Sequence, residues 1–107
     1  MPDTESLLAG LRSRADALRN LGYRVRFDLT DLEESILLDA SARGAAPSLE
    51  PAEGDEEADT VLRLASADLE KLMRGKLSPM FAFSTGKLRV EGSKGVAMKL
   101  AGLLDED

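Results

Sequence analysis

Residues 59–100, DTVLRLASADLEKLMRGKLSPMFAFSTGKLRVEGSKGVAMKL, decide the fold because each predicted element in this stretch has its own boundary signal. Apolar and polar side chains alternate over residues 59–65, a pattern typical of a half-buried strand. Ser66 is placed to cap a short helix with one apolar face, and Gly75 is placed to end it. The stretch therefore opens with a strand followed by a helix.

Two further helices and a strand complete this stretch. Ser78 and Pro79 form an N-cap followed by a proline at the first helical position, and Gly86 is placed to end that helix. Residues 87–91 alternate as a strand, and Ser93 is placed to cap a last helix. The second half is therefore predicted to read strand, helix, helix, strand, helix.

The N-terminal half begins with an amphipathic helix. Apolar residues recur at three- and four-residue steps over residues 4–21, which predicts one continuous helix. Asp3 or Thr4 is placed to cap its N-terminus, and Gly22 is placed to end it in the left-handed conformation.

Two strands and a weaker segment follow this helix. Residues 23–29 and 34–40 alternate as strands joined by a short turn, which predicts an antiparallel hairpin. Residues 41–58 are rich in Ala, Pro, Gly and acidic residues, and Pro47 and Pro51 allow only an edge strand there. The element order predicts a single domain over residues 1–107, of the α+β class, with a mainly antiparallel sheet covered on one face by helices.

The residue inventory excludes several kinds of chemistry. The chain has no histidine and no cysteine, which removes imidazole and thiol catalysis, disulfides and thiolate metal sites. Carboxylates, lysines, serines and Tyr23 remain, but no two acids share an apolar face, so we expect no catalytic residues and no enzyme. The acidic run Glu53–Asp59 lacks the ligand spacing of a calcium loop, so we expect a solvated loop, no metal site and no cofactor.

Charge and hydropathy limit the partners. The net charge is −6 and aromatic residues make up 4% of the chain, which argues against nucleic acid. Residues 12–26 form a local basic segment between acidic ones, so a contact with an anionic surface stays open there beside the alternative of a solvated helix face. The sequence shows neither a signal peptide nor an apolar run long enough to span a bilayer, and we expect a cytoplasmic location.

The stretch from Asp59 to Leu100 resembles the sterol carrier protein 2 family, also called the non-specific lipid-transfer family. Single matches such as Gly-Lys pairs are common in proteins, whereas their ordered set across about 40 residues is specific. The matching positions are Asp59, Ser66, Leu69, Gly75, Lys76, Pro79, Ala82, Phe83, Gly86, Lys87, Leu88, Gly92, Ala97, Lys99 and Leu100.

The resemblance implies a five-stranded sheet, about four to five helices on one of its faces, and an apolar tunnel between them that holds a lipid. The candidate lining residues are Leu8, Leu11, Val25, Phe27, Ile36, Leu69, Met73, Met80, Phe83, Val90, Val96 and Leu100. For each of them the alternative is ordinary core packing. Met80 and Phe83 are favoured as ligand contacts, because they lie on the short helix where the family places its channel.

Two departures from the family pattern bear on function. The chain ends in LLDED soon after the last matched helix, without the longer C-terminal segment of animal members, and it lacks a Ser-Lys-Leu peroxisomal address. We therefore expect a small, stand-alone member of bacterial type.

Two function hypotheses follow. The first is non-catalytic binding, and possible transfer, of a lipid or other apolar small molecule, with transient contact to an anionic membrane through Arg12, Arg14 and Arg19. The second is a module with little cavity that serves as an accessory or scaffold for a lipid- or quinone-metabolising protein. An enzyme that acts through carboxylates or lysine is a distant third.

Overall fold

The computed structural model describes residues 3–42 and 45–104, so the acidic chain end at residues 105–107 lies outside the described part. Its elements in chain order are α1 (Thr4–Arg12), α2 (Ala15–Leu18), β1 (Arg24–Leu29), β2 (Glu34–Asp39), β3 (Ser48–Ala52), β4 (Thr60–Leu64), α3 (Ser66–Met73), α4 (Pro79–Ser84), β5 (Leu88–Gly92) and α5 (Lys94–Leu104). The α+β class and the five-stranded sheet are confirmed.

The five strands form one sheet in the order β3-β2-β1-β4-β5. Phe27 on β1 lies opposite Ile36 of β2 in an antiparallel pair and opposite Leu62 of β4 in a parallel pair. The pairs β2–β3 and β4–β5 are antiparallel. The predicted hairpin is therefore confirmed, and the sheet is mixed because the central strand β1 runs in the same direction as its neighbour β4.

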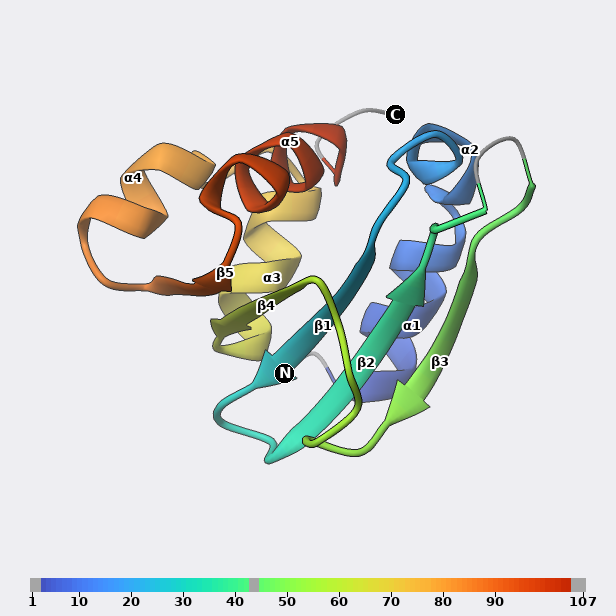
Figure 1. Cartoon of the computed structure of the whole chain (residues 1–107). Coiled ribbons are helices and arrows are strands. Elements are labelled where there is room, and N and C mark those ends of the chain that lie inside the picture. The colour runs from blue at the N-terminus through green and yellow to red at the C-terminus, as the bar shows by residue number, and fades with distance from the viewer. Residues whose placement is uncertain (1–2, 43–44, 105–107) are drawn as a thin grey trace.

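The helices cover one face of the sheet, and a loop crosses the other (Figure 1). α1 packs against β2 and β3, α5 packs against β4 and β5, and α3 lies between α1 and α5. α4 lies at the edge of the molecule, where it packs against β5 and α5 (Figure 1). The connection from β3 to β4 passes across β1 and β2 on the face away from the helices (Figure 1).

The core lies between the sheet and the helices, and the alternation of the strands explains its composition. Val25, Phe27 and Leu29 of β1 point to the helical face and are at most 1% exposed. The intervening Arg26 points to the opposite face, as alternation requires. It is still only 8% exposed, because its Nη1 donates a hydrogen bond of 2.8 Å to the Glu56 carbonyl oxygen in the crossing loop.

The single helix predicted over residues 4–21 is wrong in one respect, since it is broken at Ser13 and Arg14 into α1 and α2. Apolar spacing continues across the break, so periodicity alone does not reveal it. The prediction that Asp3 caps the helix is confirmed, because its carboxylate accepts a hydrogen bond of 2.8 Å from the Ser6 amide. Gly22 follows α2 with φ of 83°.

The boundaries of the later helices are mostly as predicted. Ser78 caps α4, and the Ser93 hydroxyl accepts a hydrogen bond of 3.2 Å from the Val96 amide at the start of α5. The prediction that Ser66 caps α3 is wrong, because Ala65 is the N-cap residue and Ser66 is the first helical residue. Among the described helices, none combines the length and the apolar character that crossing a bilayer requires.

Candidate functional site

Most of the predicted lining residues lie together in the core. Nine of the twelve belong to one cluster of side chains that are at most 9% exposed, between the sheet and α1, α3 and α5. They are Leu8, Leu11, Val25, Phe27, Ile36, Leu69, Met73, Val96 and Leu100. The structure thus places these residues where the tunnel was expected. Their role as ligand contacts stays a prediction.

The other three predicted residues lie at the edge where α4 covers the end of the sheet. Val90 of β5 is partly buried against the core cluster. Phe83 of α4 is also partly buried, whereas Met80 is 65% exposed. The predicted set is therefore divided between a packed centre and a loosely covered edge.

The α4 helix is short and weakly attached, for reasons visible in its sequence. It begins with the Ser78 cap and Pro79 and contains six residues, and Gly86 follows its last turn with φ of 81°. Ala82 is its only buried residue. Because Ala82 is the only fully buried side chain of α4 and the Phe83 ring is partly buried, displacement of the helix would expose little apolar area of the core.

Phe81 on α4 was not among the predicted site residues. Its side chain is 55% exposed beside Met80, and the neighbouring Phe83 ring has the Lys94 ammonium 5.3 Å from its centroid. This cation–π contact joins α4 to the first residue of α5. A helix of six residues has too few turns for periodicity to show which of its apolar residues face water.

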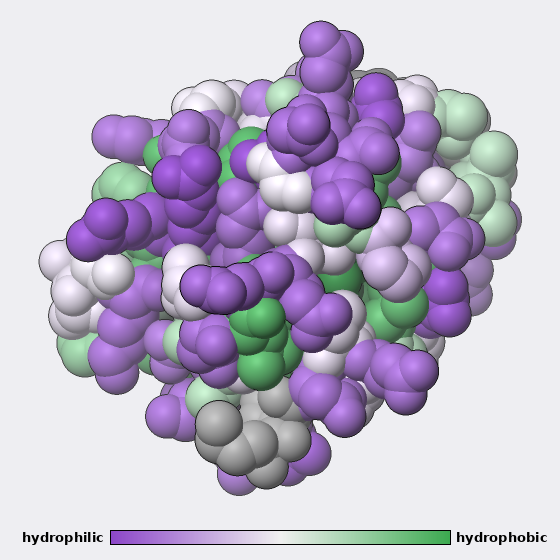
Figure 2. Space-filling view, turned by 90° about the horizontal axis from the view of Figure 1, so that it is seen from below, coloured by the Kyte–Doolittle hydropathy of each residue, from purple (hydrophilic) through white to green (hydrophobic). Residues whose placement is uncertain are grey.

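Among the clefts that the described residues form, four have volumes of about 310 to 560 Å³. Two of them have mainly polar linings, and the other two have linings that are polar and apolar in nearly equal parts. Of the twelve predicted lining residues, Met73 alone lines one of these four clefts, between α1 and α3. The space-filling view from below in Figure 2 shows mainly hydrophilic side chains on that face, and hydrophobic atoms are visible only in small separate areas.

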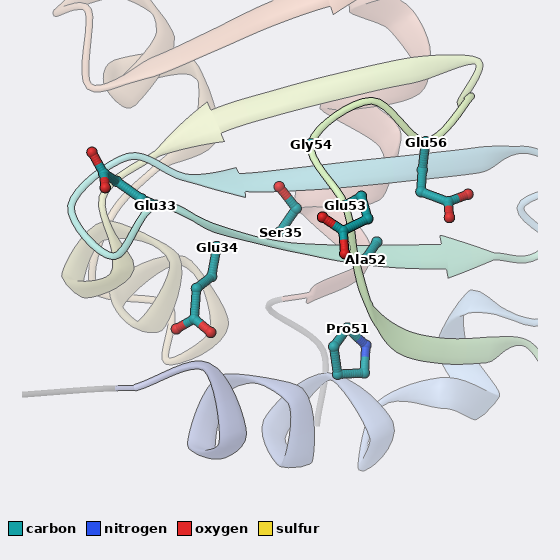
Figure 3. Close-up of a pocket in the computed structure, with 8 residues that line it drawn as sticks. All are labelled: Glu33, Glu34, Ser35, Pro51, Ala52, Glu53, Gly54 and Glu56. Carbon is teal, nitrogen blue, oxygen red and sulfur yellow. The ribbon is translucent and has the colours of Figure 1, made fainter.

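The largest of these clefts, about 560 Å³, lies between the start of β2 and the end of β3 and is acidic. Figure 3 shows that Glu33 and Glu56 lie at its opposite ends, while Glu34 points toward α1. There the Glu34 carboxylate accepts a hydrogen bond of 2.6 Å from the Thr4 hydroxyl. Within residues 3–42 and 45–104, no group of three or more acidic side chains is arranged to hold a metal ion.

The face of the sheet away from the helices carries a network centred on Asp28. Its carboxylate accepts hydrogen bonds from Arg26 Nε at 2.8 Å and from the Ser35 hydroxyl at 2.8 Å, and Arg63 Nε lies 3.3 Å away. Burial raises the pKa of Asp28, but these hydrogen bonds and the Arg26 charge outweigh it, so the pKa lies below its ordinary value. Arg63 also pairs with Glu91 at 2.6 Å, so this network is internally neutralised.

The three arginines predicted to contact a membrane all have partners within the chain. Arg14 donates hydrogen bonds to the carbonyl oxygens of Gly10, Met73 and Leu104 at 2.8 to 2.9 Å. Arg12 donates to the Leu49 carbonyl oxygen at 2.8 Å, and Arg19 pairs with Asp16 at 3.1 Å. Arg14 therefore joins the ends of α1, α3 and α5, and its guanidinium is the least available for an external contact.

Comparison with known proteins assigns this architecture to a family. The model of the SCP-2 sterol transfer family matches residues 5–105, and the chain belongs to this family. The sequence-based prediction of the family is thereby confirmed.

Individual relatives support this assignment. The chain is 47% identical to the sterol carrier protein 2 of Bos taurus over 49 residues, which is 46% of this chain and 9% of that protein. It therefore corresponds to only a small part of this relative. The apo form of sterol carrier protein 2 from Yarrowia lipolytica has a similar structure, with a TM-score of 0.74, 22% identity and coverage of 92% of this chain and 87% of the other.

A further similar structure is the protein titled UbiJ-SCP2 ubiquinone synthesis protein. Its TM-score is 0.67 at 24% identity, and the match covers 98% of this chain and 93% of that one. At this level of identity the likeness establishes a shared fold.

Proposed function

We propose that this chain binds a lipid-like apolar molecule without catalysis, between its sheet and its helices. The family match supports this class of ligand, because its family is described as one of sterol transfer. The absence of histidine and cysteine also favours binding over chemistry. Burial of an alkyl chain or fused rings would be favourable by the same area-dependent term that stabilises the core.

The observation that carries this proposal is the weak attachment of α4. The helix packs against β5, which carries Val90, and against α5, which carries Val96, yet only Ala82 of α4 is buried. Outward displacement of α4 would expose the apolar edge of the core without disturbing its centre. We place the entrance for the ligand there, with Met80, Phe83, Val90 and Val96 as its first contacts.

The remaining predicted lining residues would contact the ligand deeper between the layers. Met73 is suited to this role because its unbranched thioether side chain adapts to different shapes, and its end lies 3.3 Å from the position of a Cβ added at Gly10. The deeper set is Leu8, Leu11, Val25, Phe27, Ile36, Leu69, Met73 and Leu100.

Titration with a fluorescent fatty acid tests the proposal, and native mass spectrometry of protein isolated from cells extends the test to sterols and isoprenoids. Val96→Trp would fill the proposed entrance and should weaken binding about tenfold or more. Leu37→Trp is the matched control, because Leu37 lies on the opposite face of the sheet. Wild-type protein that binds none of these ligand classes, or equal losses in the two variants, would contradict the proposal.

The packed centre supports a second candidate function. Nine predicted lining side chains are at most 9% exposed in one cluster, and the fold resembles that of a ubiquinone synthesis protein. A module of this kind would serve as an accessory to a lipid- or quinone-metabolising protein. Protein that is consistently free of lipid in native mass spectrometry, and that co-purifies with one partner of this class, would favour this function over carriage.

The membrane contact predicted for α1 and α2 belongs to the carrier hypothesis and stays a prediction. Arg14 stabilises the fold, because its side chain donates hydrogen bonds to carbonyl oxygens near the ends of three helices. Arg12 and Arg19 have exposed side chains, at 53% and 43%, and remain the two arginines of this set whose replacement tests the contact.

A further inference from the structure

The segment of sequence that contains α4 has a net charge opposite in sign to that of the whole chain. Residues 71–90 contain five basic residues and no acidic residue, although the net charge of the protein is −6. The basic residues are Lys71, Arg74, Lys76, Lys87 and Arg89, and all five are exposed. Lys76 precedes α4 and Lys87 follows it, so the helix has a cation near each end.

The same helix carries two of the three exposed large apolar side chains of the described residues. Met80 is 65% exposed and Phe81 is 55% exposed, while the third, Tyr23, directly precedes β1 and is 37% exposed. Single exposed apolar residues are common on soluble proteins. Two consecutive ones on a helix with one buried residue form a local apolar tip, which we define as Met80 and Phe81.

Lys94 is a further cation beside α4, and it comes from a different element. Its ammonium lies 5.3 Å from the centroid of the Phe83 ring, so it is held beside α4 although it belongs to α5. A cleft of about 470 Å³ adjoins the end of α4 and is lined by Gly86, Lys87 and Arg89 among others, without an acidic residue in its lining.

We propose that α4 docks onto an anionic phospholipid bilayer, with Met80 and Phe81 inserted at the interface and Lys76, Lys87 and Lys94 among the headgroups. Apolar side chains surrounded by lysines are the pattern of an interfacial membrane anchor, because acyl chains accept the apolar part and anionic headgroups attract the cations. Figure 1 shows that the position of α4 at the edge of the molecule leaves it free to approach a flat surface.

The basic residues favour a bilayer over a second copy of this chain as the occupant. A two-fold dimer through α4 would place the same surface of both copies face to face. Lys76, Lys87 and Lys94 of each copy would then lie near their equivalents, and like charges oppose such an interface. An anionic bilayer has the complementary charge.

This inference goes beyond the proposed ligand binding, and the two are separable by experiment. Docking is measured by flotation with vesicles of phosphatidylcholine and phosphatidylglycerol, compared with vesicles of phosphatidylcholine alone. Wild-type protein should float with the anionic vesicles, and added salt should release it. Fatty acid titration in solution reports ligand binding on the same samples. The Lys76→Glu, Lys87→Glu variant separates the two activities, because Met80 is also proposed as a ligand contact.

Three variants locate the contact. Met80→Ser with Phe81→Ser, and separately Lys76→Glu with Lys87→Glu, should each reduce binding to anionic vesicles about tenfold. Tyr23→Ser is the matched apolar control and should bind as the wild type. Circular dichroism checks that each variant is folded, and the exposure of all five side chains favours an intact fold.

Four results would overturn the proposal. The first is wild-type protein that does not bind anionic vesicles, and the second is α4 variants that bind these vesicles like the wild type. The third is a larger loss of vesicle binding in Arg12→Glu with Arg19→Glu than in either α4 variant. The fourth is a dimer in sedimentation experiments that the Met80→Ser, Phe81→Ser variant abolishes while vesicle binding is unchanged, which would assign the apolar tip to a second copy.

Discussion

The guanidinium of Arg14 donates a hydrogen bond of 2.8 Å to the carbonyl oxygen of Leu104, ninety residues further along the chain. The same side chain donates to the Met73 carbonyl oxygen at 2.9 Å and to that of Gly10 at 2.9 Å. The last carbonyl groups of a helix have no partner within the helix, so one cation here satisfies groups near the ends of three helices. The break between α1 and α2 brings Arg14 to this position.

Replacement of Arg14 should therefore reduce stability. Arg14→Met keeps much of the aliphatic side chain but leaves three carbonyl oxygens without this donor, and we expect the free energy of unfolding to fall by about 2 kcal/mol. Urea denaturation at neutral pH measures the change. Arg12→Met is the control and should cost less than about 1 kcal/mol, because the Arg12 side chain is 53% exposed. Equal losses would show that Arg14 has no special role.

The turn at Gly92 gives a second prediction, because a side chain there meets the backbone of the neighbouring strand. A Cβ at Gly92 would lie 2.6 Å from the Asp59 carbonyl oxygen, and φ at this residue is 94°. Gly92→Ala should destabilise the protein by about 2 kcal/mol or more. Thermal unfolding measures it.

Gly102→Ala is the matched control for Gly92→Ala. Gly102 lies in α5 with no heavy atom within 4 Å of an added Cβ. Because alanine favours helix more than glycine, this variant should gain up to about 1 kcal/mol. A Gly92→Ala protein as stable as the wild type would show that the turn relaxes without cost.

The elements of this fold were largely predictable from local sequence signals, whereas their pairing was not. The alternation of apolar and polar residues predicted the strands, and Ser78, Ser93 and the glycines predicted helix ends. These signals are readable from sequence because they act between near neighbours in the chain. The parallel pairing of β1 with β4 joins strands separated by β2 and β3. Neither strand has a local feature that specifies this neighbour.

Tertiary contacts explain the other differences between prediction and structure. Arg26 points away from the helices, as the alternation predicted for residues 23–29 requires, yet it is buried because the loop that contains Glu56 crosses over it. Met80 and Phe83 were predicted on the right helix, but only the packing of α4 shows that Met80 and Phe81 face water. Most of the predicted lining residues are in the core, and sequence cannot distinguish a core contact from a ligand contact.

Asp31 provides a third prediction, because it supplies the helix cap that was expected from Ser66. Its carboxylate accepts hydrogen bonds from the Ser66 amide at 2.8 Å and from the Ser66 hydroxyl at 2.6 Å, at the start of α3. Asp31→Ala should cost about 1 kcal/mol, as the loss of an N-cap does. The neighbouring Thr30→Ala should change stability by less than about 0.5 kcal/mol in the same chemical denaturation experiment.

The Asp28 network predicts how stability depends on pH. The pKa of Asp28 is lowered in the folded protein, with burial opposing the shift and hydrogen bonds from Arg26 and Ser35 outweighing it. The folded state therefore favours the ionised carboxylate, and this contribution is complete above about pH 4 and is lost as the pH falls through the folded-state pKa. Asp28→Asn should be less stable than the wild type at pH 7, since Arg26 keeps its charge without a counter-ion.

The free energy of unfolding of Asp28→Asn should also fall less steeply between about pH 4 and pH 2 than that of the wild type. Urea denaturation across this range gives both slopes. Asp55→Asn makes the same chemical change in an exposed loop and serves as the control. If Asp28→Asn and the wild type lose stability in parallel, other carboxylates govern the acid unfolding.

Hydrogen exchange tests where an apolar ligand enters. Ala82 is the only fully buried residue of α4, so the amides of this helix should exchange faster than those of α3, which buries Ser66, Leu69, Leu72 and Met73. A bound fatty acid held between α4, α5 and β5 would close this edge, and we expect slower exchange over residues 80–98. Mass spectrometry with and without the fatty acid measures the difference. Slower exchange confined to α1 and β3 would place the ligand on the opposite side of the helical layer and remove α4 from its path.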